Sequence, residues 1–292
     1  MFPFIIMYDL HIIRVTVSKV LQESAESQQP RGHLDPQSFA NHIEFHTYLP
    51  PDGLSPFLEH FWTLAWHDLS EMYYSEQVMH RPSVDLFISE EESGIQGTFR
   101  TLRTYTALGN GRIIGARFLP GAFHVLWPGA MSELQDGHLS LKDVLPEIDT
   151  AQLLALDDTA AIVEIGKILQ AHLPAADENV ATINRIIRMI EEGEAPQTVT
   201  EIARVLHKSE RWLQQLFQEY VGVGLKWMLQ RHKLLAAARA ARETKTPDWS
   251  TIAYDLGYSS QQHFNTDFKR IIGKTPLQYK KSLESHRGDR TS

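Results

Sequence analysis

Residues Ile252–Gly273, with the sequence IAYDLGYSSQQHFNTDFKRIIG, have the pattern of two short helices joined by a tight turn. Ala253 and Leu256 lie on the apolar side of the first helix, and Gly257 breaks it. Ser260 is a residue type that caps the start of a helix, because its hydroxyl accepts a hydrogen bond from a free backbone amide. The stretch therefore predicts a helix-turn-helix motif.

The same pattern occurs earlier in the chain. Residues 202–222 read IARVLHKSERWLQQLFQEYVG, with a turn one residue shorter between the two helices. The buried positions, the capping serine and the closing glycine correspond one for one: Ile202 with Ile252, Ala203 with Ala253, Leu206 with Leu256, Ser209 with Ser260, Leu213 with Phe264, Phe217 with Phe268, and Gly222 with Gly273. Internal repetition of this kind predicts a duplicated unit, which a generic helical core does not explain.

The outward positions of the second helix are polar in both copies. They are Arg211, Gln214, Gln215 and Gln218 in the first copy, and Gln262, Asn265, Thr266 and Lys269 in the second. An amphipathic helix with Arg, Gln and Asn on its outer face matches a helix that enters the major groove of DNA. A single copy is common in helical proteins, so the prediction of DNA binding depends on the duplication.

A helical rod is predicted between the two copies. Residues 225–242 are almost all strong helix formers. At 1.5 Å per residue, a helix of about 19 residues spans roughly 28 Å. This length is close to the ~34 Å of one duplex turn, so we expect both outward faces to reach successive major grooves of the same DNA.

The net charge of −8 alone argues against a nucleic-acid partner, but the charge is unevenly distributed. From Val180 onward there are 18 Lys and Arg against 12 Asp and Glu, a net charge of +6, while the rest of the chain carries −14. This asymmetry favours a polyanionic partner for the carboxyl-terminal part only. Drift in composition explains it equally well where no motif accompanies it.

Residues from about Thr182 to Leu283 resemble the AraC/XylS family of transcriptional regulators. The resemblance rests on the two quoted stretches and on the segment Lys274-Thr-Pro-Leu-Gln-Tyr279. It implies a seven-helix DNA-binding domain, at about residues 180–284, that places two recognition helices in adjacent grooves of an asymmetric site. The family's base-reading positions fall on Arg211, Gln214 and Gln215 in the first helix, and on Gln261, Gln262, Asn265 and Thr266 in the second. Lys269 and the helix N-termini would hold phosphates.

Three positions depart from the family pattern. The family usually has Arg where Gln215 stands and frequently Arg where Thr266 stands, and its usual Pro after the first unit is replaced by Leu225. The loss of two cations weakens non-specific attraction to DNA, and it moves base reading from guanine toward adenine, which Gln and Asn suit. We therefore expect a specific, salt-sensitive site with some A·T content.

The amino-terminal half predicts a β-rich domain. Short β-favouring runs divided by turn residues occupy residues 84–89, 97–106 and 112–118. Gly109-Asn-Gly111 predicts a tight turn between the last two runs. Such runs favour a β-sandwich or a small barrel. Residues 54–62 predict a short amphipathic helix, and residues 139–173 predict a further helical stretch.

The whole chain is predicted to be an α+β protein of two domains, which suits its 292 residues. Residues 1–33 are expected to be a flexible leader, because they end in a polar run that is poor in aromatic residues. Residues 34–175 form the β-rich regulatory domain, and residues 285–292 are a tail after the DNA-binding domain.

Part of the amino-terminal half resembles an uncharacterised domain found on some AraC-type regulators. The matching stretches are Tyr48-Leu-Pro-Pro, Pro56-Phe-Leu-Glu-His-Phe-Trp62 and Gly115-Ala-Arg-Phe-Leu-Pro-Gly-Ala-Phe123. The resemblance implies an effector-binding or dimerising module, with a cupin-like β-barrel as one form of it. In the simpler interpretation, Pro120-Gly121 is a turn, and Phe118 and Phe123 belong to the core.

The chemistry of this half is sparse. The sequence contains no cysteine, no Ser/His/Asp arrangement, no phosphate-binding glycine loop and no spaced pair of catalytic carboxylates. Four histidines are candidate metal ligands, although partly buried or surface histidines are the simpler interpretation: His42, His46, His80 and His124. Asp85 and Arg117 lie inside apolar runs, so they pair with each other, contact a polar ligand or face solvent. We expect no enzyme, no metal and no cofactor, and the sequence names no effector-binding residue.

These patterns predict a bacterial, cytoplasmic transcription factor that joins the nucleoid when it is bound to DNA. Its expected partners are duplex DNA at promoters, RNA polymerase, a small-molecule effector and a second copy of the chain. No membrane partner is expected, because no stretch approaches the roughly 20 apolar residues of a membrane span. Two alternatives stay open: a nucleoid-type DNA-binding protein without a ligand, and a DNA-targeted enzyme whose amino-terminal domain is catalytic. The missing cysteine argues against a methyl-acceptor repair enzyme.

Overall fold

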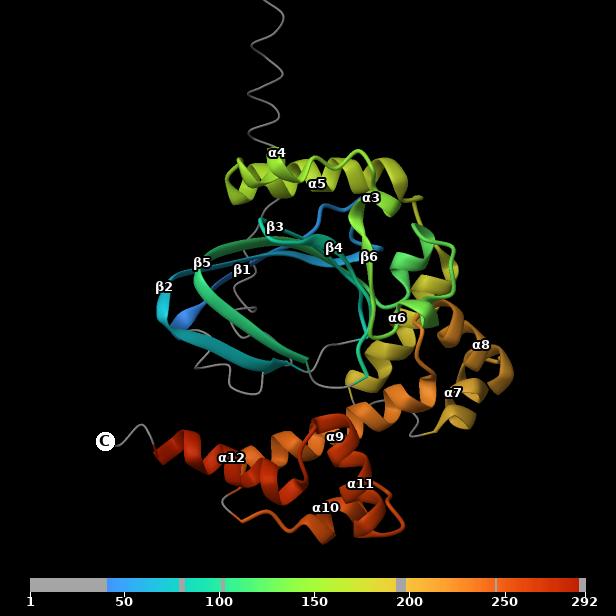
Figure 1. Ribbon diagram of the computed structural model, residues 1–292. Helices are drawn as coiled ribbons and strands as arrows, with labels where there is room; N and C mark the ends of the chain where they lie inside the picture. Colours follow the sequence, from blue (N-terminus) through green and yellow to red (C-terminus); the bar gives the residue numbers. More distant parts are fainter. Residues whose placement is uncertain (1–40, 79–81, 101–102, 193–197, 245, 289–292) are drawn as a thin grey trace, which may run out of the picture.

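The computed structural model describes residues 41–78, 82–100, 103–192, 198–244 and 246–288. The proposed leader of residues 1–33, the candidate ligand His80 and residues 289–292 lie outside the described residues. Two parts follow one another along the chain: a curved sheet with helices on one face, and a set of helices drawn in yellow to red (Figure 1). Among the described helices, none is long and apolar enough to cross a membrane.

The amino-terminal part contains one antiparallel sheet of six described strands. They are β1 (Glu44–Tyr48), β2 (Leu58–Val78), β3 (Asp85–Ser89), β4 (Ser93–Gln96), β5 (Arg103–Phe118) and β6 (His138–Ser140). Their order in the sheet is β1-β2-β5-β3-β4-β6, so β1 and β6 form its two edges. The long strands β2 and β5 curve strongly (Figure 1), and within the described residues the sheet bends like part of a barrel without closing into one.

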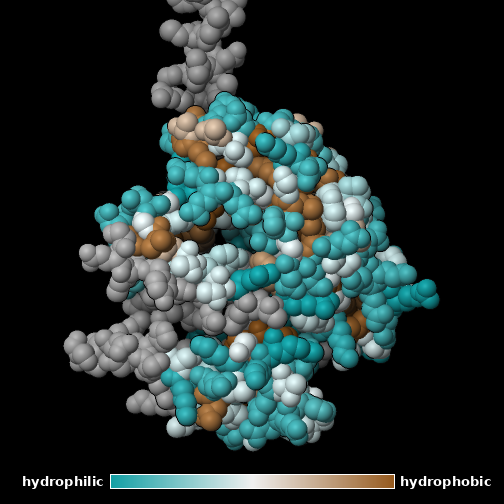
Figure 2. Space-filling view, in the orientation of Figure 1, coloured by the Kyte–Doolittle hydropathy of each residue, from teal (hydrophilic) through white to brown (hydrophobic). Residues whose placement is uncertain are grey.

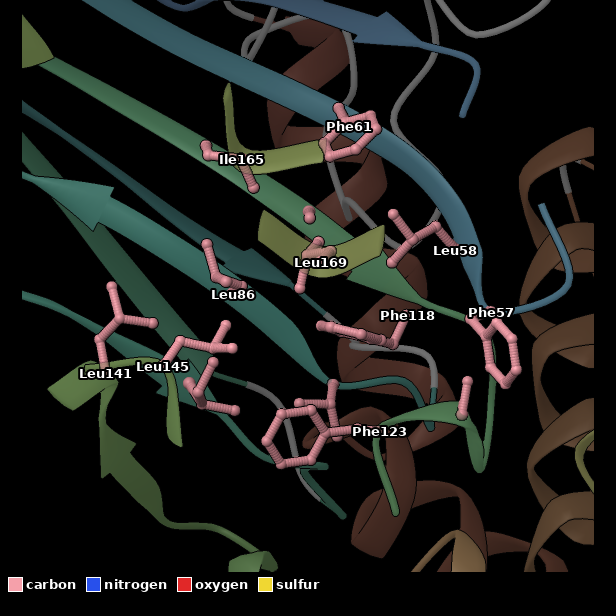
Figure 3. Packing of buried hydrophobic residues seen from close by; sticks show 14 of the residues in the cluster. Phe57, Leu58, Phe61, Leu86, Phe118, Phe123, Leu141, Leu145, Ile165 and Leu169 are labelled. Carbon is pink, nitrogen blue, oxygen red and sulfur yellow. The ribbon is translucent and has the colours of Figure 1, made fainter. Parts of the chain in front are cut away.

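Short helices cover the outer face of this sheet. They are η1 (Ala122–Val125), η2 (Met131–Leu134), α3 (Leu141–Val144), α4 (Thr150–Leu154) and α5 (Asp158–His172). Figure 3 shows the main core, in which Ile165 and Leu169 of α5 meet Phe61 of β2. Gly166 of α5 faces the same core, where a Cβ would lie in ordinary van der Waals contact with Phe61 and Leu54. Outside the core, Arg112 Nε donates to the Asp158 carboxylate at 2.9 Å and ties β5 to α5.

The predicted tight turn at residues 109–111 is wrong. β5 runs without interruption through this stretch, and the strand pairing with β2 shifts its register at Gly109, whose φ is +63°. Gly111 faces Trp66 so closely that a Cβ would collide with the indole ring. The glycines therefore bend one long strand and make room for a tryptophan, because flexible backbone serves either purpose and long-range pairing decides between them.

The predicted helix at residues 54–62 is also wrong. Leu54 to Phe57 form turns, and β2 begins at Leu58. Phe61 faces the helices and Trp62 faces the other side of the sheet, where it lies over Gly115. Both faces of this strand are buried, so its apolar run has no clean period of two and is easily mistaken for an amphipathic helix. The helical stretch predicted at 139–173 contains β6's last residues, α3, α4 and α5.

The carboxyl-terminal part has seven helices in its described residues, as the family resemblance implied. They are α6 (Glu178–Glu191), α7 (Val199–Val205), α8 (Glu210–Tyr220), α9 (Leu225–Glu243), α10 (Trp249–Asp255), α11 (Gln261–Ile272) and α12 (Pro276–Gly288). Two separate cores form: one between α6, α7, α8 and the start of α9, and one between the end of α9, α10, α11 and α12. The two cores thus share the rod α9, whose 19 residues match the predicted length.

Candidate functional site

The two helix-turn-helix units, α7–α8 and α10–α11, have the same local construction. The hydroxyl of Ser209 accepts a hydrogen bond from the Trp212 amide at 3.1 Å, and that of Ser260 accepts one from the His263 amide at 3.3 Å. The capping box at Thr198 is complete, with Glu201 accepting from the Thr198 amide. Because the caps fix where each helix begins, the polar positions of α8 and α11 have equivalent places in the two units.

A second contact is repeated between the helices of each unit, and sequence reasoning missed it. Thr200 Oγ1 donates to Glu210 Oε1 at 2.7 Å, and Ser250 Oγ donates to Gln261 Oε1 at 2.9 Å. Both hydroxyls lie in the first helix of their unit, and both acceptors are the first residue of the second helix. The two repeats did contain a signal for this contact: Thr200 stands ten positions before Glu210, and Ser250 stands eleven positions before Gln261.

The sequence-predicted DNA-reading residues lie mainly on uncovered faces. On α8, four of them are exposed in the full described chain: Arg211, Gln214, Gln215 and Gln218. On α11, four more are exposed: Gln261, Gln262, Thr266 and Lys269. Asn265 differs, because it is half-buried and its Oδ1 is enclosed with no hydrogen-bond partner among the described residues. The Thr266 hydroxyl donates to the Gln262 carbonyl within the helix at 3.0 Å.

Hydrogen bonds join the rod α9 to the second unit and to α12. Gln230 hydrogen-bonds to Asp267 of α11 through its amide nitrogen and accepts from Arg270 at 2.9 Å through its oxygen. At the other end of the rod, the buried Lys280 Nζ donates to the Ala241 carbonyl at 3.0 Å. Arg270 also pairs with Asp267 at 2.7 Å, so its charge is already matched within the protein, whereas Lys269 beside it is exposed. Neither Gln230 nor Lys280 was predicted.

The face of the sheet opposite the main core carries a row of polar side chains. The strand register pairs His60 with Arg117, Arg117 with Asp85, Asp85 with Gln96, and Gln96 with His138, so the row crosses five strands. Directly opposed residues lie on the same face of a sheet. Figure 2 shows the molecule hollowed where Figure 1 draws the opening of this curved sheet.

The buried Asp85 and the half-buried Arg117 form an ion pair at the centre of the row, which settles their alternatives in favour of pairing. Arg117 Nε and Nη2 donate to the two carboxylate oxygens at 2.9 and 3.1 Å, and Trp62 Nε1 donates to Oδ1 at 3.2 Å. Burial lowers the pKa of Arg117, but the charge and hydrogen bonding of Asp85, together with the charges of Glu59 and Tyr105, leave the pKa above its usual value. Burial and the Asp85 charge raise the pKa of Tyr105 to about 12.

A cavity of about 240 Å³ lies at one end of this row. Gln96 and His138 belong to both the row and the cavity wall, which also includes Phe99, Arg103 and Tyr105. The guanidinium of Arg103 stacks on Phe99 at 4.1 Å, and its Nε is buried with no hydrogen-bond partner among the described residues. No group of three potential metal ligands occurs in the described residues, and His42 stacks on Tyr74 instead.

Comparisons with known proteins bear on the helical part. A family model described as a helix-turn-helix domain matches residues 202–282. An AraC-like transcription regulator of Streptomyces antibioticus is 34% identical over 84 residues, which are 29% of this chain and 27% of that protein. The regulatory protein SoxS of Salmonella typhimurium is 33% identical over 102 residues, covering 35% of this chain and 94% of SoxS. The chain belongs to the AraC/XylS family of transcriptional regulators.

Another relative matches a similar length of this chain. The F1 operon positive regulatory protein of Yersinia pestis is 37% identical over 101 residues, which are 34% of this chain and 33% of that protein. This chain therefore matches about a third of the length of that relative. Residues 46–140 match a family described as a domain of unknown function, DUF6597.

Two solved structures are similar at a low level. ToxT from Vibrio cholerae is 12% identical, with 83% of this chain and 98% of that chain covered at a TM-score of 0.35. The carboxyl-terminal domain of AraT from Geobacillus stearothermophilus is 24% identical, with 36% and 88% covered at a TM-score of 0.32.

Proposed function

We propose that this AraC-family chain regulates transcription by placing α8 and α11 in successive major grooves of one promoter site. The observation that carries the proposal is the pair of equivalent, capped recognition helices whose polar faces stay uncovered in the full described chain. The net charge of +6 from Val180 onward supports a polyanionic partner. The length of α9, about 28 Å at 1.5 Å per residue, supports grooves one duplex turn apart.

We assign base reading to the polar positions of the two helices. They are Arg211, Gln214 and Gln215 on α8, and Gln261, Gln262, Asn265 and Thr266 on α11. Gln218 is a further DNA-facing position of α8, and Lys269 lies at a phosphate. Gln261 already accepts a hydrogen bond from Ser250, so its amide nitrogen is the group left to face a base acceptor. With Gln and Asn in most of these positions, adenine is the base that they suit best.

The amino-terminal domain is proposed to modulate promoter binding, through a small-molecule effector or through a second copy of the chain. The cavity beside the Asp85–Arg117 row supports effector binding, because Arg103 and Tyr105 offer polar groups next to aromatic rings. The proposed domain limits are 34–175 and 180–284, and the proposed setting is the bacterial cytoplasm with RNA polymerase as a further partner. All these roles are those of a regulator without catalysis of its own.

Selection of bound sequences from random duplex DNA with the full-length chain tests the proposal. The expected outcome is one asymmetric site with two A·T-containing half-sites about one turn apart. Arg211→Ala should then weaken binding to that site by about 1–3 kcal/mol, because a base contact is lost. Lys167→Ala, which removes an exposed charge on α5, is the matched control and should leave binding unchanged. Uniform coverage of all DNA would instead indicate a nucleoid-type protein, and a purely G·C-rich site would contradict the assigned base preference.

A thermal-shift screen of the full chain against small metabolites tests the regulatory role. A ligand that binds the folded state raises the unfolding temperature, and the rise grows with the logarithm of the ligand concentration relative to Kd. Arg103→Gln should abolish that shift if the ligand occupies the proposed cavity. If the ligand still raises the unfolding temperature of this variant by the same amount, the effector binds at a different site.

A further inference from the structure

Tyr220 breaks the repeat between the two helix-turn-helix units. It stands at the last turn of α8, three residues after Phe217, and its counterpart in α11 is Ile271, three residues after Phe268. Ile271 is 1% exposed and belongs to the core of its own unit. Tyr220 instead packs against both the core of its own unit and the core of the amino-terminal domain. An interior apolar position of the motif has thus become a contact between domains.

The Tyr220 side chain is held on two sides. Asn179 Nδ2, at the start of α6, donates a hydrogen bond to the phenol oxygen at 2.9 Å. The ring lies 4.3 Å from the His124 ring, centroid to centroid, at a tilt of 52°. His124 belongs to η1 of the amino-terminal domain, and its Nε2 is also 3.8 Å from the Glu219 carboxylate. The end of the first recognition helix is therefore fixed by groups from outside its own unit.

At two glycines beside this contact, the backbone is packed too closely to accept a Cβ atom. Gly222 follows α8 with φ +79°, and a Cβ there would lie 2.5 Å from the Met131 carbonyl oxygen of η2. On the opposite side, a Cβ at Gly121 would lie 2.8 Å from Ile183 Cδ1. Asn184 Nδ2 donates to the Pro120 carbonyl at 3.0 Å and closes the same interface. Two glycines and the hydrogen bond from Asn184 to Pro120 make this a specific docking contact between the domains.

The second recognition helix is held differently. Its hydrogen bonds and ring contacts join it to α9, α10 and α12, as in the Gln230–Asp267 bond and the Phe268–Tyr279 ring pair. Figure 1 draws α8 beside η1, η2 and the sheet domain, and draws α10 and α11 apart from them. The amino-terminal domain therefore touches the two units unequally.

We propose that Tyr220 is a positioning residue, through which the amino-terminal domain sets the first recognition helix while α9 sets the second. The inference rests on the proposed DNA-binding function. Arg211, Gln214 and Gln215 stay exposed while Tyr220 is docked, so the docking orients the reading face of α8 without covering it. A displacement of η1 or η2 then changes the recognition of the first DNA half-site alone.

The experiment uses the full-length chain and the duplex that it selects from random DNA. Tyr220→Ile gives the first unit the residue of the second, and His124→Ala removes the ring partner from the other domain. Each should reduce discrimination against a scrambled first half-site about tenfold, which corresponds to about 1.4 kcal/mol, and leave discrimination at the second half-site unchanged. Tyr220→Phe keeps the ring contact and should retain most of that discrimination.

The double variant Tyr220→Ile/His124→Ala should lose no more than Tyr220→Ile alone, because both substitutions remove the same ring contact between the domains. Equal losses at both half-sites would mean a purely structural role and would overturn the proposal, as would unchanged or improved reading of the first half-site. Hydrogen exchange without DNA gives a readout that does not depend on the proposed function. Faster exchange in α8 with unchanged exchange in α11 supports the positioning role even for a chain that selects no site, and equal changes in both helices contradict it.

Discussion

The two helix-turn-helix units have one design and two kinds of support. Both have a serine cap, a hydroxyl contact to the first residue of the second helix and a left-handed glycine at its end. The first unit, however, contacts the amino-terminal domain through Tyr220 and the His124 ring, whereas the second is held by α9 and α12. The motif thus specifies its own fold. Its orientation depends on which neighbouring element contacts it, and in the first unit a single residue, Tyr220 in place of an interior isoleucine, makes that contact.

The largest difference between the units is expected at their closing glycines. Gly222→Ala and Gly273→Ala both force alanine into a left-handed conformation, with φ of +79° and +78°, at a cost of about 1–2 kcal/mol. Gly222 faces the Met131 carbonyl of the other domain, whereas Gly273 is exposed, so substitution of Gly222 should cost about 1–3 kcal/mol more through overpacking. Thermal unfolding of the two variants measures the difference. Equal destabilisation of the two variants would contradict this, because it would mean that η2 moves away from residue 222 at no cost in free energy.

A substitution confined to the support of the second unit should act there alone. Lys280→Met keeps the apolar stem but leaves the Ala241 carbonyl without its donor, at an expected cost of about 1–3 kcal/mol. Hydrogen exchange should accelerate at the end of α9 and in α12, and remain unchanged in α7 and α8. The neighbouring Lys281 is exposed, and Lys281→Met should stay within about 0.5 kcal/mol of the parent chain.

Removal of the serine caps should affect both units alike and so define what they share. Ser209→Ala and Ser260→Ala each remove one hydrogen bond to a free amide, at about 1 kcal/mol. Local hydrogen exchange in α8 and α11 is the suitable measurement. A much larger effect in one unit would mean that its cap also supports contacts beyond the helix.

The smallest expected effect concerns pH and the part of α9 nearest the first unit. Burial lowers the pKa of His232 in the folded chain, with Glu191 of α6 opposing it. Below the ordinary pKa of about 6.5 the unfolded chain therefore binds more protons than the folded one, so His232 makes stability fall as the pH falls. The urea midpoint should drop less between pH 7.5 and 5.5 in His232→Gln than in the parent chain. An identical drop in both would contradict this assignment.

The sequence was most informative where structure is decided locally. The repeat, the capping serines and the helix-forming rod predicted α7 to α11 closely, because helix starts and ends are encoded within a few residues. The sheet was harder: Gly109 and Gly111 read as a turn, and only their pairing with Leu69 and Trp66 of a distant strand makes them a bend. The role of Tyr220 had one sequence signal, a tyrosine where the other copy has isoleucine, and its meaning depended on a partner 96 residues away.

The tryptophans that lie over glycines also supply an optical probe. Trp62 and Trp66 rest on Gly115 and Gly111 at the inner face of the sheet, and the indole nitrogen of Trp62 is bonded to Asp85. A molecule that settles on this face would change the surroundings of these two indoles and hence the wavelength and intensity of their fluorescence. The chain has six tryptophans, so replacement of the other four by phenylalanine would isolate that emission.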